Sequence, residues 1–444
     1  MPPVPSLFRT TSTWPRRARL VALPIAAGLL LAACGSSSSS SKAADTAAPG
    51  TTAPATTTTC VKDVGRVIAT PPTAASTTAV LPADLVTTLD TAATSSFAEA
   101  ASPGAVVGVR TPAGTWIKSY GIADATTKAP MTDAVHQRIG SVTKTFTGTA
   151  IMQLVEQGKI SLSDTIDRYV PGVPNGDRIT LKMLANMTSG VASYTRSTQF
   201  VDTYFAHPEL VFTPDQVLKV GVSESPLFEP GAQFDYSNTN TVLLGMVIEK
   251  VTGKSVGDVF VQNIIAPLGL SNTSWPGNSP ALPDAHAQGY TLQGGGSPAS
   301  PTNATNWNPG WGWTAGALIS DIDDLLVYAR ALGTGQGLLS PASQATRLDA
   351  LPSPGGYGIA MGCIDGWVGH TGELPGFNTS VFYDTGTDTT VIVEVNSDIA
   401  SGKCPESPTL VDDPGEAVCR APATRMFVAL SAALGHPFVP APSK

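Results

Sequence analysis

The spacing of apolar residues along the chain predicts distinct helical and strand regions. Apolar residues lie on one side of a helix over 85–101. Two short strand-like runs follow over 105–109 and 116–120, and the turn residues between them predict a β-hairpin. Over 142–158 apolar residues again recur at helical spacing, and Gly158 marks the end of that helix. The first part of the folded region is therefore predicted to be helix, hairpin and helix.

The last part of the chain has a different pattern. Short Gly/Asp turns separate four strand-like runs, at 357–362, 367–370, 379–383 and 390–395, and an amphipathic helix over 421–434 follows them. The middle alternates short helical patterns with Pro and Gly. We therefore expect an α+β fold, with an antiparallel sheet formed by both ends of the folded region, flanking helices, and an inserted, mainly helical lobe. A substrate site is expected in a cleft between sheet and lobe.

The N-terminal segment has the pattern of an export signal. Three arginines at positions 16, 17 and 19 precede an apolar run over 20–31, which ends in Ala32, Ala33 and Cys34. This ending resembles the bacterial lipobox and predicts a lipoprotein signal peptide over 1–33, with lipid attached to Cys34. Several acyl chains would then hold the protein to the outer face of the bacterial cytoplasmic membrane. The alternative is an ordinary secretory signal with an incidental cysteine.

Residues 34–80 consist mainly of Ser, Thr, Ala and Pro. Such a segment has little apolar surface to bury, so we expect a disordered tether. Residues 60–68 interrupt it and are a candidate for docking on the folded domain, which is expected to span 81–437. Apart from Cys34 the chain has four cysteines, which allow three pairings in an oxidising compartment. Cys404 and Cys419 flank a short loop and are the easiest pair to join, which would leave Cys60 for Cys363.

Charge and histidine placement exclude several kinds of partner. The formal net charge of the 444 residues is −8, and no stripe of Lys and Arg is present to neutralise phosphates. Nucleic acid is therefore not expected as a partner. The five histidines are scattered and none has the spacing of a helical ligand pair, so neither a metal site nor a cofactor is expected. We expect a monomer.

Three short motifs in order indicate acyl transfer through a serine ester. The first is Ser141-x-x-Lys144, which places a hydroxyl and an amine on one face at the start of a helix. Helix N-termini favour negative charge, and a neutral lysine amine can act as the base that activates the serine. Neutrality requires desolvation or neighbouring cations. The alternative is a helix-capping serine beside a solvated lysine.

The second motif is Tyr236-x-Asn238, and the third is His370-Thr371-Gly372 at the end of a predicted strand. Tyr236 is suited to relay a proton, and Asn238 to hold a substrate amide oxygen, although a helix cap would also explain Asn238. Gly372 permits a ligand to approach the backbone closely. The backbone N–H of the following residue, Glu373, would then join that of Ser141 in an oxyanion hole. A surface histidine at a strand exit is the alternative for His370.

The three motifs resemble the serine β-lactamase/penicillin-binding superfamily. The chain is most similar to its class C β-lactamase-like group, especially the D-alanyl-D-alanine carboxypeptidases of Streptomyces type, whose third motif is also His-Thr-Gly. Matching strings surround the motifs; they begin at Leu184, Phe228, Phe234, Leu244, Pro267 and Trp313. The resemblance runs over about 81–436 and implies the β-lactamase/transpeptidase-like fold. It also implies that Ser141 is the acylated nucleophile, Lys144 the base and Tyr236 the proton relay, with Asn238 and residues 370–372 holding substrate.

The resemblance has two departures. Met187 stands where family members often have histidine, and His370 replaces the lysine usual in β-lactamases. A mostly neutral imidazole should attract a substrate carboxylate weakly or in a pH-dependent way. The first hypothesis is a D,D-carboxypeptidase that acts on peptidoglycan stem peptides and is acylated by β-lactams. The alternatives are a class C-like β-lactamase, an esterase or D-amino-acid amidase, and a binding protein without turnover.

Overall fold

The computed structural model describes residues 59–72, 79–351, 356–400 and 421–439. The expected signal segment 1–33, the lipid site Cys34, most of the tether and the cysteine pair Cys404 and Cys419 lie outside these residues. Within the described part, no helix combines the length and apolar character needed to cross a membrane.

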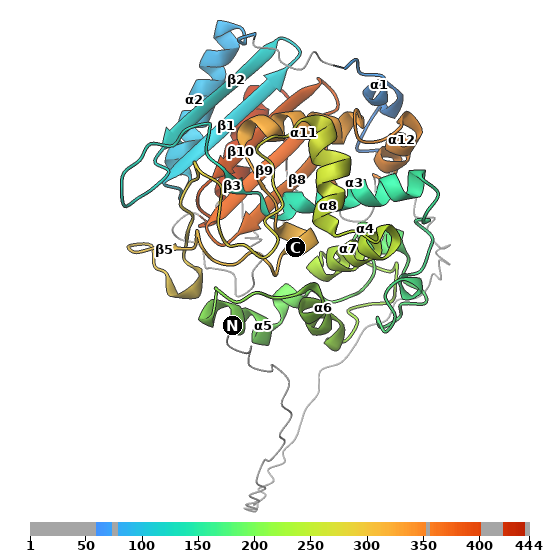
Figure 1. Ribbon diagram of the computed structural model, residues 1–444. Coiled ribbons are helices and arrows are strands. Elements are labelled where there is room, and N and C mark those ends of the chain that lie inside the picture. Colours follow the sequence, from blue (N-terminus) through green and yellow to red (C-terminus); the bar gives the residue numbers. More distant parts are fainter. Residues whose placement is uncertain (1–58, 73–78, 352–355, 401–420, 440–444) are drawn as a thin grey trace, which may run out of the picture. The chain divides into compact units, whose positions relative to one another are not determined.

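A six-stranded antiparallel sheet forms the centre of the fold (Figure 1). Its strands lie in the order β2-β1-β10-β9-β8-β7, so the N-terminal hairpin pairs directly with the C-terminal meander. In the pairing of β1 with β10, for example, Val107 lies opposite Val393. The strands of the main sheet are β1 (Gly104–Thr111), β2 (Gly114–Gly121), β7 (Gly362–Ile364), β8 (Trp367–Leu374), β9 (Phe377–Asp384) and β10 (Thr389–Val395). Two small sheets pair β3 (Gln137–Arg138) with β6 (Ile319–Ser320), and β4 (Tyr290–Thr291) with β5 (Thr302–Asn303).

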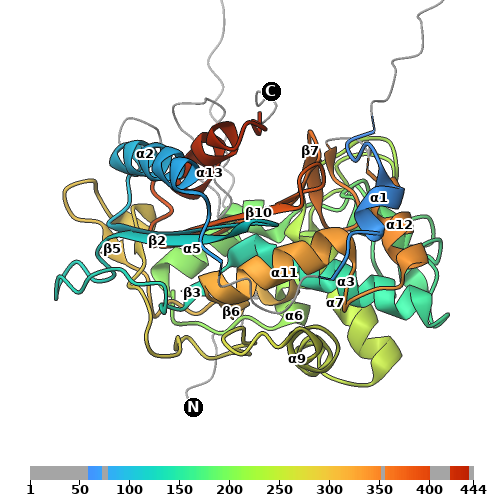
Figure 2. The same cartoon turned by 90° about the horizontal axis from the view of Figure 1, so that it is seen from above.

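Helices cover both faces of this sheet (Figure 2). The helices α2 and α13 pack on one face, and α11 packs on the other. Because both faces are covered, β10 is buried along its whole length: Val391, Val393 and Val395 face α13, whereas Ile392 faces the opposite core. The helices are α1 (Val64–Ile68), α2 (Ala83–Glu99), α3 (Thr143–Glu156), α4 (Leu181–Ala185), α5 (Thr198–Ala206), α6 (Pro214–Ser223), α7 (Asn238–Thr252), α8 (Val256–Phe260), α9 (Ala266–Leu268), α10 (Trp313–Gly316), α11 (Ile322–Thr334), α12 (Pro341–Asp349) and α13 (Pro422–Ala433).

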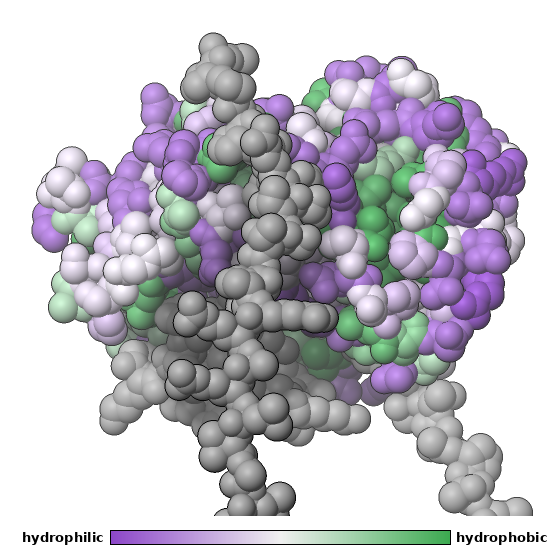
Figure 3. Space-filling view, turned by 90° about the horizontal axis from the view of Figure 1, so that it is seen from below, coloured by the Kyte–Doolittle hydropathy of each residue, from purple (hydrophilic) through white to green (hydrophobic). Residues whose placement is uncertain are grey.

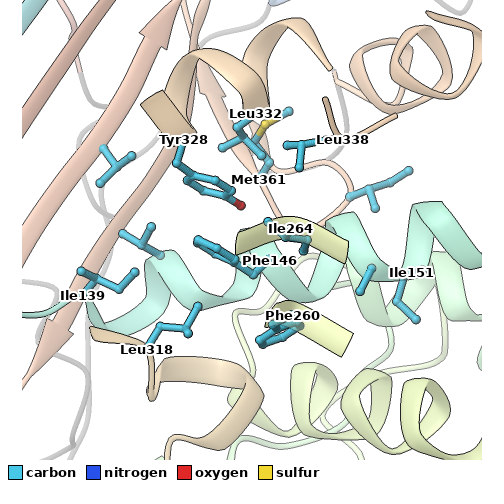
Figure 4. Packing of buried hydrophobic residues seen from close by; sticks show 14 of the residues in the cluster. Ile139, Phe146, Ile151, Phe260, Ile264, Leu318, Tyr328, Leu332, Leu338 and Met361 are labelled. Carbon is cyan, nitrogen blue, oxygen red and sulfur yellow. The ribbon is translucent and has the colours of Figure 1, made fainter. Parts of the chain in front are cut away.

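Helix α3 lies at the centre of the core on the α11 side of the sheet, and most of its residues are buried. Phe146 stacks on Tyr328 of α11 with ring centroids 3.9 Å apart, and Phe260 contacts it from the end of α8 (Figure 4). Truncation of such a buried aromatic side chain to alanine costs about 3–5 kcal/mol. This packing fixes the axis of α3 between the sheet and the helices of the inserted lobe.

The predicted fold class is confirmed, and most predicted elements lie where the spacing put them. The helices over 85–101, 142–158 and 421–434 correspond to α2, α3 and α13, and the hairpin corresponds to β1 and β2. One strand prediction was wrong: over 357–362 the chain makes only an isolated bridge from Tyr357 to Gly362, and β7 begins at Gly362. The glycines at 356 and 358 and the left-handed Ala360 (φ 50°) interrupt the extended conformation there.

The segment 59–72 is folded and held to the rest of the domain, although it lies within the stretch expected to be a tether. Cys60 forms a disulfide with Cys363 of β7. The guanidinium of Arg66 donates to the carbonyl of Thr385, and Arg330 Nη2 of α11 donates to the carbonyl of Pro71 over 2.7 Å. The expected tether therefore contains a folded segment that includes α1.

The face of the molecule seen from below is largely hydrophilic (Figure 3). Apolar residues reach it in groups, mainly on the right-hand part of the view. Large apolar side chains that are exposed, such as Val211, Leu227 and Val261, belong to separate elements of the chain. Single exposed apolar residues of this kind are normal for a soluble domain surface.

Candidate active site

Ser141 lies in the 3-10 turn η1 (Gly140–Val142), which leads directly into α3. The residue in the capping position of α3 is Val142, so Ser141 does not cap this helix. Gly140 has φ 49°, and a Cβ there would lie 2.4 Å from the amide nitrogen of Glu373. Only glycine fits this conformation and this close approach without strain. The turn therefore holds the serine against β8 at the start of a buried helix.

Lys144 is fully buried one turn further along the same helix. Its Nζ lies 2.9 Å from Ser141 Oγ and donates to the carbonyl oxygen of Ala315 over 2.7 Å. Burial lowers the pKa of this amine well below its usual value, because desolvation penalises the charged form. The alternative of a solvated lysine is therefore wrong, and desolvation favours the neutral form of the amine that a base for Ser141 requires.

Tyr236 completes the immediate surroundings of the serine. Its ring lies beside the lysine, with Nζ 4.9 Å from the ring centroid, and its hydroxyl is hydrogen-bonded to Ser141. Burial raises the pKa of this phenol, so its hydroxyl keeps its proton. A neutral phenol between the serine and the amine is able to accept one proton while it passes on another.

Asn238 is the first residue of α7 and follows Ser237, which occupies the capping position. Its backbone N–H donates to Ser193 Oγ over 3.1 Å, and its side-chain nitrogen donates to Thr195 Oγ1 over 3.0 Å. These contacts tie the second motif to the turn η3 (Tyr194–Arg196) of the lobe. The side chain is thus held by the lobe, and its amide nitrogen keeps one further hydrogen for a ligand.

The third motif lies inside β8 and not at its end, because the strand continues to Leu374. A Cβ on Gly372 would lie 1.9 Å from the carbonyl oxygen of Ile139 and 3.3 Å from the amide nitrogen of Ser141. The strand therefore passes against the backbone of the serine turn, which no other residue type would allow. With the close approach of Gly140 to Glu373, this contact places the backbone of Ser141 beside that of Glu373, the two residues expected to form the oxyanion hole.

His370 is buried and hydrogen-bonded on both ring nitrogens. Its Nδ1 bonds the carbonyl oxygen of Thr371, and its Nε2 lies 2.9 Å from the hydroxyl of Tyr357. Burial and the nearby Lys144 lower the pKa of the imidazole to about 3. The ring is thus neutral at physiological pH, and it is not the exposed histidine of the alternative reading.

Two contributors to this site were missed from the sequence. Ala315 was part of a matching string, but its carbonyl oxygen as a partner of the lysine depends on how α10 packs against α3. Tyr357 was placed in a strand, although its glycine neighbours signal an irregular turn. Within the described residues, no group of three or more His, Cys, Asp or Glu side chains is arranged to hold a metal ion.

Comparisons with known proteins show what this chain is similar to. The sequence model of the family described as Beta-lactamase matches residues 84–407. Penicillin-binding protein 4* of Bacillus subtilis (strain 168) is 34% identical over 176 residues, which are 39% of this chain and 38% of that protein. The chain thus matches less than two-fifths of the length of that curated relative.

Solved structures show the same fold. A D-stereospecific amidohydrolase from Streptomyces sp. is 31% identical with a TM-score of 0.63, and the match covers 70% of this chain and 94% of that one. The D-amino acid amidase from Ochrobactrum anthropi SV3, solved with L-phenylalanine amide, is 24% identical with a TM-score of 0.65. That match covers 79% of this chain and 100% of the amidase, and at this identity it supports the fold alone.

Proposed function

The chain belongs to the beta-lactamase family of serine hydrolases, and from this premise we propose that it hydrolyses peptide or amide bonds beside D-amino acids through an acyl-enzyme at Ser141. The observation that carries the proposal is the contact of 2.9 Å between Ser141 Oγ and the buried amine of Lys144. A serine hydroxyl needs an adjacent base, and this amine is desolvated and within reach.

The proposed acylation moves one proton and exchanges one bond. Ser141 Oγ attacks the substrate carbonyl carbon and its proton passes to Lys144 Nζ. The backbone N–H groups of Ser141 and Glu373 stabilise the negative oxygen of the tetrahedral intermediate. The C–N bond then breaks, and the leaving amine takes the proton through Tyr236. Water repeats the sequence on the ester, which releases the acid and restores the serine.

Two substrate classes fit this chemistry. The first is the D-alanyl-D-alanine terminus of peptidoglycan stem peptides, cleaved by a D,D-carboxypeptidase that β-lactams would acylate. The second is an amide or ester of a D-amino acid, and the 31% identity with the D-stereospecific amidohydrolase favours it. A class C-like β-lactamase would differ from the D,D-carboxypeptidase in the rate at which its acyl-enzyme hydrolyses.

Intact-mass measurements with benzylpenicillin test the proposed nucleophile. We expect an adduct of one penicillin per chain that is absent in Ser141→Ala and present in Ser223→Ala, an exposed serine on α6. A persistent adduct supports the peptidase, and a transient adduct with accumulating product supports the lactamase. Turnover of a D-amino-acid ester by Ser141→Ala at the wild-type rate would contradict the mechanism.

We further propose that the protein acts at the outer face of the bacterial cytoplasmic membrane, as a monomer held by lipid on Cys34. The basis is the sequence pattern that ends at this cysteine. Radiolabelled palmitate should be incorporated into the full chain and not into Cys34→Ala, and globomycin should block processing. Secretion of the wild-type protein into the medium without palmitate label would contradict the anchor.

A further inference from the structure

The hydrogen bond between Tyr357 and His370 has a defined direction. The carbonyl oxygen of Thr371 only accepts, so His370 Nδ1 must donate to it and carries the ring proton. In the neutral imidazole Nε2 is then an acceptor, and the hydroxyl of Tyr357 donates to it over 2.9 Å. The hydroxyl proton of Tyr357 is therefore donated to Nε2 of His370.

These two residues form part of an aromatic wall beside the nucleophile. The ring of Tyr357 stands edge-on to His370 with centroids 5.5 Å apart, and edge-on to Tyr236 with centroids 6.1 Å apart. The ring of Phe234 lies beside that of Tyr357, with centroids 6.2 Å apart. Tyr236 is also hydrogen-bonded to Ser141, and its ring lies beside Lys144. The wall therefore borders the position that the scissile bond must occupy when Ser141 attacks it.

The basic side chains packed around this wall are buried or hydrogen-bonded. Lys144 bonds Ser141 and the carbonyl of Ala315. Arg347 is fully buried on α12 and donates to Thr149 and to the carbonyl of Thr145, both on α3. Arg196 forms an ion pair of 2.6 Å with Asp235, next to Tyr236. A substrate carboxylate in this region would meet neutral aromatic groups and cations that are already paired or buried.

We propose that Tyr357 is a specificity-determining residue. Through its hydrogen bond to His370 it keeps the aromatic wall neutral. A neutral wall favours acyl donors whose leaving group carries an uncharged amide or ester over donors whose leaving group carries a free carboxylate. The proposal rests on the proposed function and narrows its substrate class. A substrate carboxylate that gives up a hydrogen bond to water and gains none at the wall binds more weakly, by a factor of about ten to a hundred. We therefore expect discrimination of at least about ten-fold.

A matched substrate pair tests this directly. N-acetyl-D-alanyl-D-alanine and its C-terminal primary amide differ only in their terminal group, a carboxylate or an uncharged carboxamide, and release of D-alanine or D-alaninamide reports cleavage of the peptide bond that they share. We expect kcat/KM to be at least about ten-fold higher for the amide, at a ratio that stays constant from pH 5.5 to 8 because His370 remains neutral. Equal rates, or a preference for the carboxylate, would overturn the proposal while leaving Ser141 acylation intact.

Variants then assign the preference to Tyr357. In Tyr357→Phe, His370 Nε2 loses its donor, so we expect the ratio to fall several-fold and to become pH-dependent at the acid end. A merely structural role would leave the ratio unchanged. Tyr169→Phe, which removes a hydroxyl bonded to Asp164 in the lobe, is the matched control and should keep the wild-type ratio.

Where a variant or a substrate turns over too slowly for kcat/KM to be measured, a competition experiment measures binding instead. The two ligands compete with an alkyl fluorophosphonate for Ser141, and the amide should protect the serine at about ten-fold lower concentration. Should Tyr357→Phe leave the ratio of the two protecting concentrations unchanged, Tyr357 would not read the leaving group, and the proposal would be wrong. Absence of any fluorophosphonate adduct would instead refute the proposed function itself.

Discussion

Glu394 of β10 makes the stability of this domain dependent on pH. Its side chain is fully buried, and neither carboxyl oxygen has a hydrogen-bond partner among the described residues. Burial, and to a smaller extent the nearby Asp321 and Asp324, raise the pKa of this carboxyl well above its usual value. The folded protein therefore keeps a proton on Glu394 at a pH where the unfolded chain has released it.

The sign and size of the effect follow from this difference. An unfolded glutamate has a pKa of about 4.3, so the two states bind the same number of protons below that pH. Above it, and up to the raised pKa of the folded state, the free energy of unfolding falls by up to about 1.4 kcal/mol per pH unit. Replacement by glutamine removes the ionisation while it keeps the shape of the side chain.

Urea unfolding at pH 4.5, 6 and 7.5 measures the prediction. Glu394→Gln should resemble the wild type at pH 4.5 and become progressively more stable than it at higher pH. Glu224→Gln, at an exposed position, is the matched control and should show no such trend. Asp323 and Asp324 also have raised pKa values, but they titrate in wild type and variant alike. A difference between Glu394→Gln and wild type that is independent of pH would refute the reasoning.

Three further predictions concern the site and the N-terminal segment. Lys144→Met should lower kcat about 10²–10⁴-fold, as expected when a general base is lost, while a normal melting temperature shows that the fold is kept. Gly372→Ala should abolish acylation, because its Cβ would lie 1.9 Å from the carbonyl oxygen of Ile139; retention of full activity would show that β8 can move away. Reduction of the Cys60–Cys363 disulfide, which spans a sequence separation of 303, should lower the free energy of unfolding by up to about 5 kcal/mol. A melting temperature unchanged by dithiothreitol would contradict that estimate.

The elements best predicted from the sequence are those set by local spacing. The hairpin of β1 and β2 follows from two short strand-like runs joined by turn residues, and α3 follows from its helical repeat. The spacing of Ser141 and Lys144 likewise places both groups on one face of one turn, because residues three apart in a helix are neighbours. The strand predicted over 357–362 failed because glycine and left-handed backbone conformations outweigh apolar composition there.

The sequence by itself therefore indicated the reaction type, through the order of three motifs that begins with a hydroxyl and an amine three residues apart. It left open how far the pKa of the amine is lowered, since water is removed from Lys144 only where the sheet and the helical lobe pack around it. The partner of His370 was equally out of reach, because the Tyr357–His370 contact depends on how an irregular turn packs against β8. The tertiary structure decided the charge state of the site, because desolvation arises from groups far apart in the sequence.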